Sequence, residues 1–77
     1  MRIKVILHSY LRELLPAEAQ GQTKLEIPEN STISNVLQIL GITTSVACAL
    51  NENYEPDRNK ILKDGDELRV LRPGAGG

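Results

Sequence analysis

The chain has 77 residues, a formal net charge of −1 and a single cysteine. A chain of this length forms one domain and buries only roughly 60% of its unfolded surface, so a deep enclosed active site is hard to build. One cysteine forms no internal disulfide, the basic residues are scattered rather than clustered, and no apolar run nears the ~20 residues of a membrane span. We therefore expect a cytoplasmic protein that binds neither nucleic acid nor membrane, with its function on the surface or at a terminus.

The first predicted elements are a strand and a short helix. Apolar and polar residues alternate over 3–7, which predicts a strand with one buried face, and Ile6 indicates that the other face is partly covered too. Leucines at i, i+3 and i+4 over 9–15 predict a helix with Ser9 as its N-cap and Pro16 as its end. The leucines expected to face the core are Leu11, Leu14 and Leu15.

A second strand and the main helix follow a polar loop over 17–22. Leu25 and Ile27 predict a strand over 23–27. The clearest helix begins after Thr32, its expected N-cap, and ends before Gly41, which fits the left-handed position after a helix. Its apolar stripe consists of Ile33, Val36, Leu37 and Leu40.

The second half of the chain predicts two more strands and a short edge strand. The apolar run over 45–50 indicates a central strand buried on both faces, which makes Cys48 an inert core residue. Residues 54–60 are expected to be irregular, with an edge strand around Tyr54. A tight Asp64-Gly65 turn precedes the last strand, over 67–72.

Few other side chains suggest chemistry. Asp64, Asp66 and Glu67 are explained by the turn rather than by a metal site. His8 has no nucleophile nearby in the pattern, so we interpret it as a surface or packing histidine rather than a general base. The element order predicts an α+β domain over 1–72, with helices on one face of a mixed sheet and a flexible tail over 73–77.

The tail itself is Pro73-Gly74-Ala75-Gly76-Gly77. It is either an idle frayed terminus or a functional end. A Gly-Gly terminus has no β-carbon, so it can thread a narrow channel and leaves its carboxylate sterically open. A partner enzyme could join that carboxylate to the α-phosphate of ATP, and a sulfur nucleophile could then displace AMP.

The sequence resembles the small ubiquitin-like sulfur carriers, most of all the small subunit of molybdopterin synthase. The similar segments span nearly the whole chain: Leu11-Arg12-Glu13-Leu14, Thr32-Ile33, Ala49-Leu50-Asn51-Glu52, Leu62-Lys63-Asp64-Gly65-Asp66-Glu67-Leu68 and Pro73-Gly74-Ala75-Gly76-Gly77. The chain departs from the family at Leu7, often aromatic there, at Leu15-Pro16, often a glycine, and at Arg72-Pro73, often two prolines. These departures bear on the pathway rather than on the fold.

The resemblance implies a β-grasp fold and a carrier without catalytic residues or a bound cofactor. It implies that a ubiquitin-activating-type adenylyltransferase, which uses ATP, converts the Gly77 carboxylate to a thiocarboxylate. The tail residues Pro73, Gly74, Ala75 and Gly76 would thread into the large subunit of molybdopterin synthase, or into another sulfur-accepting enzyme. Ile6, Leu71 and Arg72 are candidates for docking on the sheet face opposite the helices. The alternatives are a thiamine-pathway sulfur carrier, a modifier conjugated to lysines through Gly77, and a binding module with an idle tail.

Overall fold

The structure is a computed structural model that describes residues 1–73. Its five-stranded sheet has the order β2-β1-β5-β3-β4. The strands are β1 (Arg2–Leu7), β2 (Gln22–Glu26), β3 (Ala47–Leu50), β4 (Asn53–Tyr54) and β5 (Glu67–Leu71). The helices are the α-helix α1 (Ile33–Ile39) and two 3₁₀ helices, η1 (Ser9–Leu14) and η2 (Ala17–Ala19).

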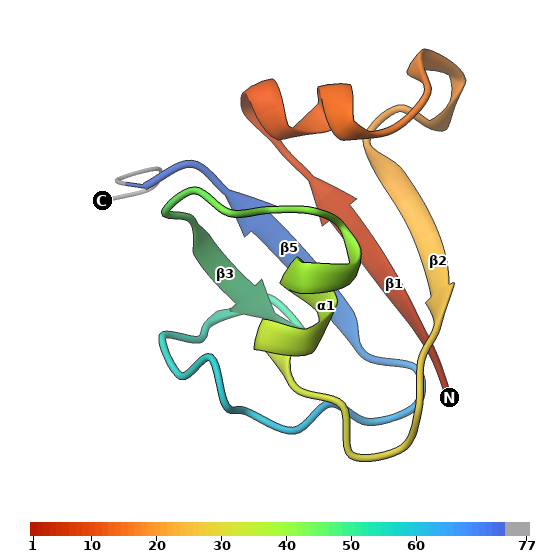
Figure 1. Ribbon diagram of the computed structural model, residues 1–77, viewed down its shortest axis with the longest axis vertical. Coiled ribbons are helices and arrows are strands. Elements are labelled where there is room, and N and C mark those ends of the chain that lie inside the picture. Colours follow the sequence, from red (N-terminus) through yellow and green to blue (C-terminus); the bar gives the residue numbers. More distant parts are fainter. Residues whose placement is uncertain (74–77) are drawn as a thin grey trace.

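The sheet is mixed, because its first and last strands in the chain, β1 and β5, pair in parallel at its centre. All other neighbouring strands pair antiparallel. The main helix α1 lies across one face, and η1 lies at the end of the sheet that β1 and β5 reach (Figure 1). This arrangement confirms the predicted α+β β-grasp fold.

The core lies between α1 and the covered face of the sheet. Every second side chain of the inner strands points there, and these are 0 to 1% exposed. Burying one such side chain fully stabilises the fold by roughly 1.5–3 kcal/mol. The deepest members are Ile3, Val5 and Leu7 of β1, Leu68 and Val70 of β5, Cys48 of β3, and Ile33 and Val36 of α1.

The main helix begins and ends where its sequence predicts. The Thr32 hydroxyl accepts from the Asn35 N–H at 3.2 Å, and Asn35 Oδ1 accepts from the Thr32 N–H at 2.9 Å. This capping box satisfies two donors that the helix itself cannot pair. Gly41 follows the helix with φ +75°, a left-handed conformation that glycine adopts without strain.

The short helix after β1 differs from its prediction. It is a 3₁₀ helix, and Ser9 is not its N-cap: Ser9 has φ +58°, and His8 precedes the helix without a capping side-chain bond. Leu11 enters the core, but Leu14 is 48% exposed. Pro16 ends the helix as predicted, since Leu15 before it is extended. The leucine spacing suits an α-helix, but a chain that must turn back into β2 after so few residues adopts the tighter form.

The prediction that β3 is the central strand, buried on both faces, is wrong. The central strand is β5, and β3 lies between it and the two-residue β4, which confirms the edge strand expected around Tyr54. Cys48 is fully buried, whereas Ala47 and Ala49 on the other side are only half-buried. Alanine counts as apolar in the sequence pattern, but its side chain is too small to need a second core. The apolar run over 45–50 therefore arises because small alanines lie on the uncovered face of β3.

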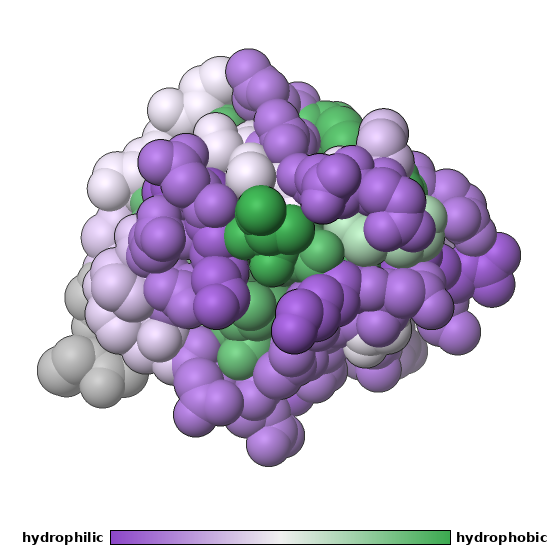
Figure 2. All heavy atoms as spheres, turned by 90° about the horizontal axis from the view of Figure 1, so that it is seen from below, coloured by the Kyte–Doolittle hydropathy of each residue, from purple (hydrophilic) through white to green (hydrophobic). Residues whose placement is uncertain are grey.

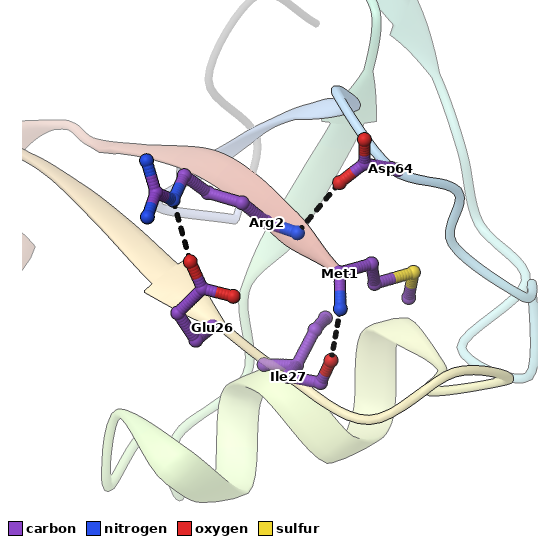
Figure 3. A network of polar contacts seen from close by, with 5 residues as sticks. All are labelled: Met1, Arg2, Glu26, Ile27 and Asp64. Atoms are coloured by element: carbon purple, nitrogen blue, oxygen red, sulfur yellow. Dashed lines mark hydrogen bonds and ion pairs between the residues drawn. The ribbon is translucent and has the colours of Figure 1, made fainter.

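A polar network ties the start of β1 to its neighbours (Figure 3). The Met1 amino group donates to the Ile27 carbonyl at 2.8 Å, and Arg2 Nε lies 2.6 Å from Glu26 Oε1. The Arg2 N–H donates to Asp64 Oδ1 at 2.8 Å, which joins β1 to the turn before β5. Gly65 in that turn has φ +87°, as an Asp-Gly turn requires.

Candidate functional site

The last strand leads directly into the tail, and its end is fixed from both sides. Val70 lies between Leu7 of β1 and Cys48 of β3 in register, and Leu71 lies opposite Ala47. The His8 N–H donates to the Val70 carbonyl at 3.0 Å, so the pairing continues past the end of β1. The chain therefore leaves the sheet from its central strand, at a point held by two neighbours.

The residues that carry the predicted chemistry follow this strand end. Arg72 and Pro73 are exposed and are the last residues that the structure describes. Gly74, Ala75 and Gly76, predicted to thread into a partner, and Gly77, predicted to be activated, lie outside the described residues. The described part thus supplies the base from which the tail starts.

The sheet face opposite α1, called here the open face, carries every second side chain of the strands. It consists of Arg2, Lys4, Ile6, Gln22, Lys24, Glu26, Ala47, Ala49, Tyr54, Glu67, Arg69 and Leu71. These side chains range from half-buried to exposed, except Ile6. Because β5 is central and leads into the tail, this face adjoins the start of the tail.

The predicted docking residues occupy different positions on this face. Ile6 is on it, but it is only 8% exposed and offers little contact area. Leu71 is half-buried beside Ala47, and Arg72 beyond it is exposed. Leu71 and Arg72 are therefore accessible enough to contact a partner, whereas Ile6 mainly packs against its neighbours in the sheet.

The sequence analysis missed the β3–β4 part of the same face. Tyr54 lies opposite Ala49 in register and is 72% exposed. Together Leu71, Ala47, Ala49 and Tyr54 form what we call the apolar strip, which crosses from the central strand to the edge. The small residues Ala47 and Ala49 on either side of Cys48 already indicated that this side of the strand is uncovered. A strand buried on both faces is usually rich in larger side chains.

Two other reactive side chains lie near the strand end. Cys48 is fully buried, and burial raises the pKa of its thiol, while the nearby positive charge of Arg58 acts in the opposite direction. The thiol is therefore held protonated and shielded, which agrees with its interpretation as a core residue. His8 Nε2 is buried and has no hydrogen-bond partner among the described residues.

Metal ligands and membrane spans were searched in residues 1–73. In that range no three side chains of His, Cys, Asp or Glu come together as a metal site would require. Asp66 instead accepts from the Lys63 N–H at 2.8 Å and from Asn51 Nδ2 at 2.9 Å, which are contacts of the turn. None of the helices described is long and apolar enough to cross a bilayer.

Apolar side chains on the remaining surface are few. Figure 2 shows the end of the molecule seen from below, where a small apolar cluster is surrounded by hydrophilic side chains. Ile61, which bridges to Thr32 before α1, and Ile39 of α1 are 52% and 56% exposed. Scattered apolar residues of this kind are normal on a protein surface and define no second site.

The fold and the strand end that precedes the Gly-Gly terminus define a ubiquitin-like β-grasp protein of the sulfur-carrier type. The profile of the ThiS family matches residues 6–77, so the match includes the terminal glycines. The chain belongs to the ThiS family. No curated protein matches its sequence.

Solved structures share the fold over almost their full length. A protein from Pyrococcus furiosus assigned as molybdopterin converting factor subunit 1 superposes with a TM-score of 0.76 at 21% identity, covering 95% of this chain and 98% of that one. SAMP1 from Haloferax volcanii gives 0.74 at 16% identity, with 100% of both chains covered. A complex of subunits 1 and 2 of molybdopterin-converting factor from Helicobacter pylori gives 0.66 at 23%, again with 100% of both. At these identities the likeness shows the fold.

Proposed function

We propose that this chain is a sulfur carrier whose Gly77 carboxylate is converted to a thiocarboxylate that donates sulfur in molybdopterin biosynthesis. The observation that carries the proposal is that the family match continues through the tail to Gly77, the last residue. An idle terminus would have no reason to follow a family pattern. The small-subunit names of two structural neighbours favour the molybdopterin pathway over its siblings.

The proposed chemistry belongs to the carboxylate and the partner enzymes. A carboxylate oxygen of Gly77 attacks the α-phosphorus of ATP, pyrophosphate leaves, and an acyl adenylate forms. A hydrosulfide-level sulfur nucleophile then attacks the carbonyl carbon, and AMP leaves with the electron pair of the broken C–O bond. The product is a thiocarboxylate. Its sulfur attacks an electrophilic carbon of the acceptor, and water then cleaves the acyl–sulfur bond, which leaves the sulfur on the acceptor and returns Gly77 to a carboxylate.

The chain contributes presentation rather than catalysis in this scheme. Within residues 1–73, Cys48 is buried with a raised thiol pKa, and no hydrogen bond joins it to a base. The base of the tail is instead held by the pairings of Val70 and Leu71, which limits where the terminus can reach. Five residues beyond Arg72 span at most roughly 17 Å, long enough to enter a partner's channel while the domain stays outside.

Two partners follow from the scheme. The first is a ubiquitin-activating-type adenylyltransferase, which uses ATP. The second is the large subunit of molybdopterin synthase, and the Helicobacter pylori neighbour, solved as a complex of subunits 1 and 2, supports a large-subunit partner. Both would meet the tail, so both would dock beside it, on the apolar strip and Arg72.

A protein modifier is the second candidate function. Two Haloferax volcanii neighbours support it, one of them titled small archaeal modifier protein 1, with a TM-score of 0.74 and 15% identity. The activation step would be the same, but a lysine amine would take the acyl group instead of sulfur. A thiamine-pathway carrier is the third candidate, and it differs only in the acceptor enzyme.

Intact-mass spectrometry tests the proposal. The chain is incubated with ATP, a sulfur source and a ubiquitin-activating-type enzyme that is proven active on its own carrier. We expect a mass gain equal to one oxygen-to-sulfur exchange, localised to Gly77 by fragmentation. Unchanged mass would count against the carrier, and lysine-linked conjugates of high mass in cell extracts would instead favour the modifier.

A further inference from the structure

The open face has an excess of positive charge in a chain that is negative overall. It carries four cations, Arg2, Lys4, Lys24 and Arg69, and two carboxylates, Glu26 and Glu67, whereas the whole chain has a net charge of −1. Two of the cations are in ion pairs with these carboxylates: Arg2 with Glu26 at 2.6 Å, and Arg69 with Glu67 at 3.6 Å. The other two lysines are in no ion pair within residues 1–73.

These two lysines face each other. Lys4 of β1 and Lys24 of the edge strand β2 are direct cross-strand partners in the antiparallel register, and both side chains are exposed. Like charges placed directly opposite on one sheet face destabilise the pairing. An oppositely charged pair would stabilise the same two positions, as Arg2 and Glu26 do in the next row. Lys4 also lies beside Glu67 of β5 in the parallel register, but Glu67 is in an ion pair with Arg69, so neither lysine has an ion-pair partner within residues 1–73.

The surface beside the pair is hollowed rather than flat. A shallow recess of about 320 Å³ is lined by Arg2, Lys4 and Lys24 together with the Asp64-Gly65 turn. A second recess, of about 370 Å³, has Lys4, Arg12 and Arg69 in its lining, together with the carboxylate Glu67 and uncharged residues. Lys4 stands at the border of both, so one extended partner segment could contact both recesses.

We propose that this basic area, defined by Lys4, Lys24 and Arg12, docks an acidic segment of the enzyme that activates Gly77. The proposal rests on the proposed function, because it assigns a surface to that partner. Charge complementarity points to an acidic segment, since the lysine pair lacks carboxylate partners that a docked segment could supply. The apolar strip lies on the same face, with Glu67 and Arg69 of β5 between it and the lysine pair. An apolar centre with a charged border is the usual anatomy of a protein interface.

A protein partner fits this surface better than a nucleic acid does. Nucleic-acid binding rests on many phosphate contacts, and this area offers only three basic side chains that are in no ion pair within residues 1–73. Charged pairs of this kind mainly speed association and set the choice of partner. A carrier that must leave the activating enzyme and reach an acceptor gains from fast association without very tight binding.

The test is charge reversal of the lysine pair, with a matched control elsewhere. Lys4→Glu/Lys24→Glu keeps two like charges opposite each other but places a carboxylate beside Glu67 of β5, so thermal unfolding is measured for every variant and binding is compared at a temperature where each is folded. Lys60→Glu/Lys63→Glu makes the same change in net charge in the exposed loop before β5, where both lysines line a different recess. Both variants and the native chain are measured for binding to the purified adenylyltransferase and for adenylation of Gly77.

We expect the Lys4/Lys24 variant to associate at least about tenfold more slowly at low salt, with the difference shrinking at high salt, and the control to stay within about twofold of the native chain. Equal losses in both variants would overturn the docking proposal. In that outcome, continued adenylation of the native chain would leave the carrier function intact. A native chain that the enzyme neither binds nor adenylates would overturn both proposals. Lysine-dependent binding of a 20-nucleotide RNA probe, at the affinity measured for the enzyme, would overturn the choice of a protein partner.

Discussion

The backbone of Gly21 packs against the backbone of Leu7. The Leu7 N–H donates to the Gly21 carbonyl at 2.6 Å, and a β-carbon on Gly21 would lie 2.6 Å from the Leu7 carbonyl oxygen. Gly21 also has φ +77°. This contact closes the connection between β1 and β2, so the position requires glycine for two separate reasons, the left-handed backbone and the lack of space.

Replacing Gly21 should therefore destabilise the fold more than replacing another left-handed glycine. A left-handed conformation costs a residue with a β-carbon about 1–2 kcal/mol. Gly41→Ala, at φ +75° with nothing within 4 Å of the added β-carbon, should show only this cost, whereas Gly21→Ala should add the clash and exceed it. Denaturant unfolding measures both, and equal losses would show that the connection before β2 yields to the added atom.

The capping box of α1 should contribute measurably to stability. Thr32→Ala removes the oxygen that accepts from the Asn35 N–H and should lower the free energy of unfolding by about 1 kcal/mol. Thr32→Ser keeps the hydroxyl and is the matched control. If both variants lose the same amount in denaturant unfolding, the loss comes from packing of the Thr32 methyl group and not from the cap.

Cys48 makes stability depend on alkaline pH. Its thiol pKa is raised above the ordinary value of 9.0 in the folded protein, chiefly by burial. Because the folded pKa is the higher one, this contribution is fully present below pH 9 and is lost as pH rises through the folded value. The difference in stability between the native chain and Cys48→Ala should therefore narrow as pH rises above 9, as measured by denaturant unfolding. A constant difference would mean that the thiolate is tolerated where Cys48 lies.

The same burial predicts slow thiol chemistry. A thiol reagent should react with Cys48 only as fast as the protein opens, and immediately once it is unfolded in denaturant. Fast labelling of the native protein would contradict the core position of this residue.

Removing Gly77 should separate function from fold. The deletion leaves residues 1–73 and their contacts unchanged, so the unfolding temperature should stay the same while thiocarboxylate formation is lost. Adding one alanine after Gly77 moves the carboxylate onto a residue with a β-carbon and should also abolish activation. A fully active extended chain would support the reading in which the tail is idle.

Much of the fold could be predicted from local patterns. The alternation in β1, the capping signals of Thr32 and Gly41 around α1, and the Asp64-Gly65 turn each reflect the chemistry of a few neighbouring residues. Such signals are read correctly because they need no distant partner. The terminal Gly-Gly, with the segments that resemble the sulfur carriers, likewise led to the family that the profile match confirms.

The errors occur where a distant part of the chain decides the outcome. The leucines after β1 predicted an α-helix capped by Ser9, but the short return to β2 imposed a 3₁₀ helix. The apolar run around Cys48 predicted a central strand, but its place in the sheet depends on β5, which pairs with it from twenty residues away along the chain. Ile6 stays a predicted docking residue, and its exposure of only 8% depends in the same way on distant neighbours in the sheet.

The sequence by itself thus determined the strand β1, the caps of α1, the Asp64-Gly65 turn and the terminus that we propose to carry sulfur, because each follows from residues adjacent in the chain. Only the tertiary structure decided which strand is central, which small side chains line the open face beside the tail, and that Lys4 and Lys24 face each other. The physical reason is that strand register joins residues that are far apart in the sequence, and no local pattern contains that information.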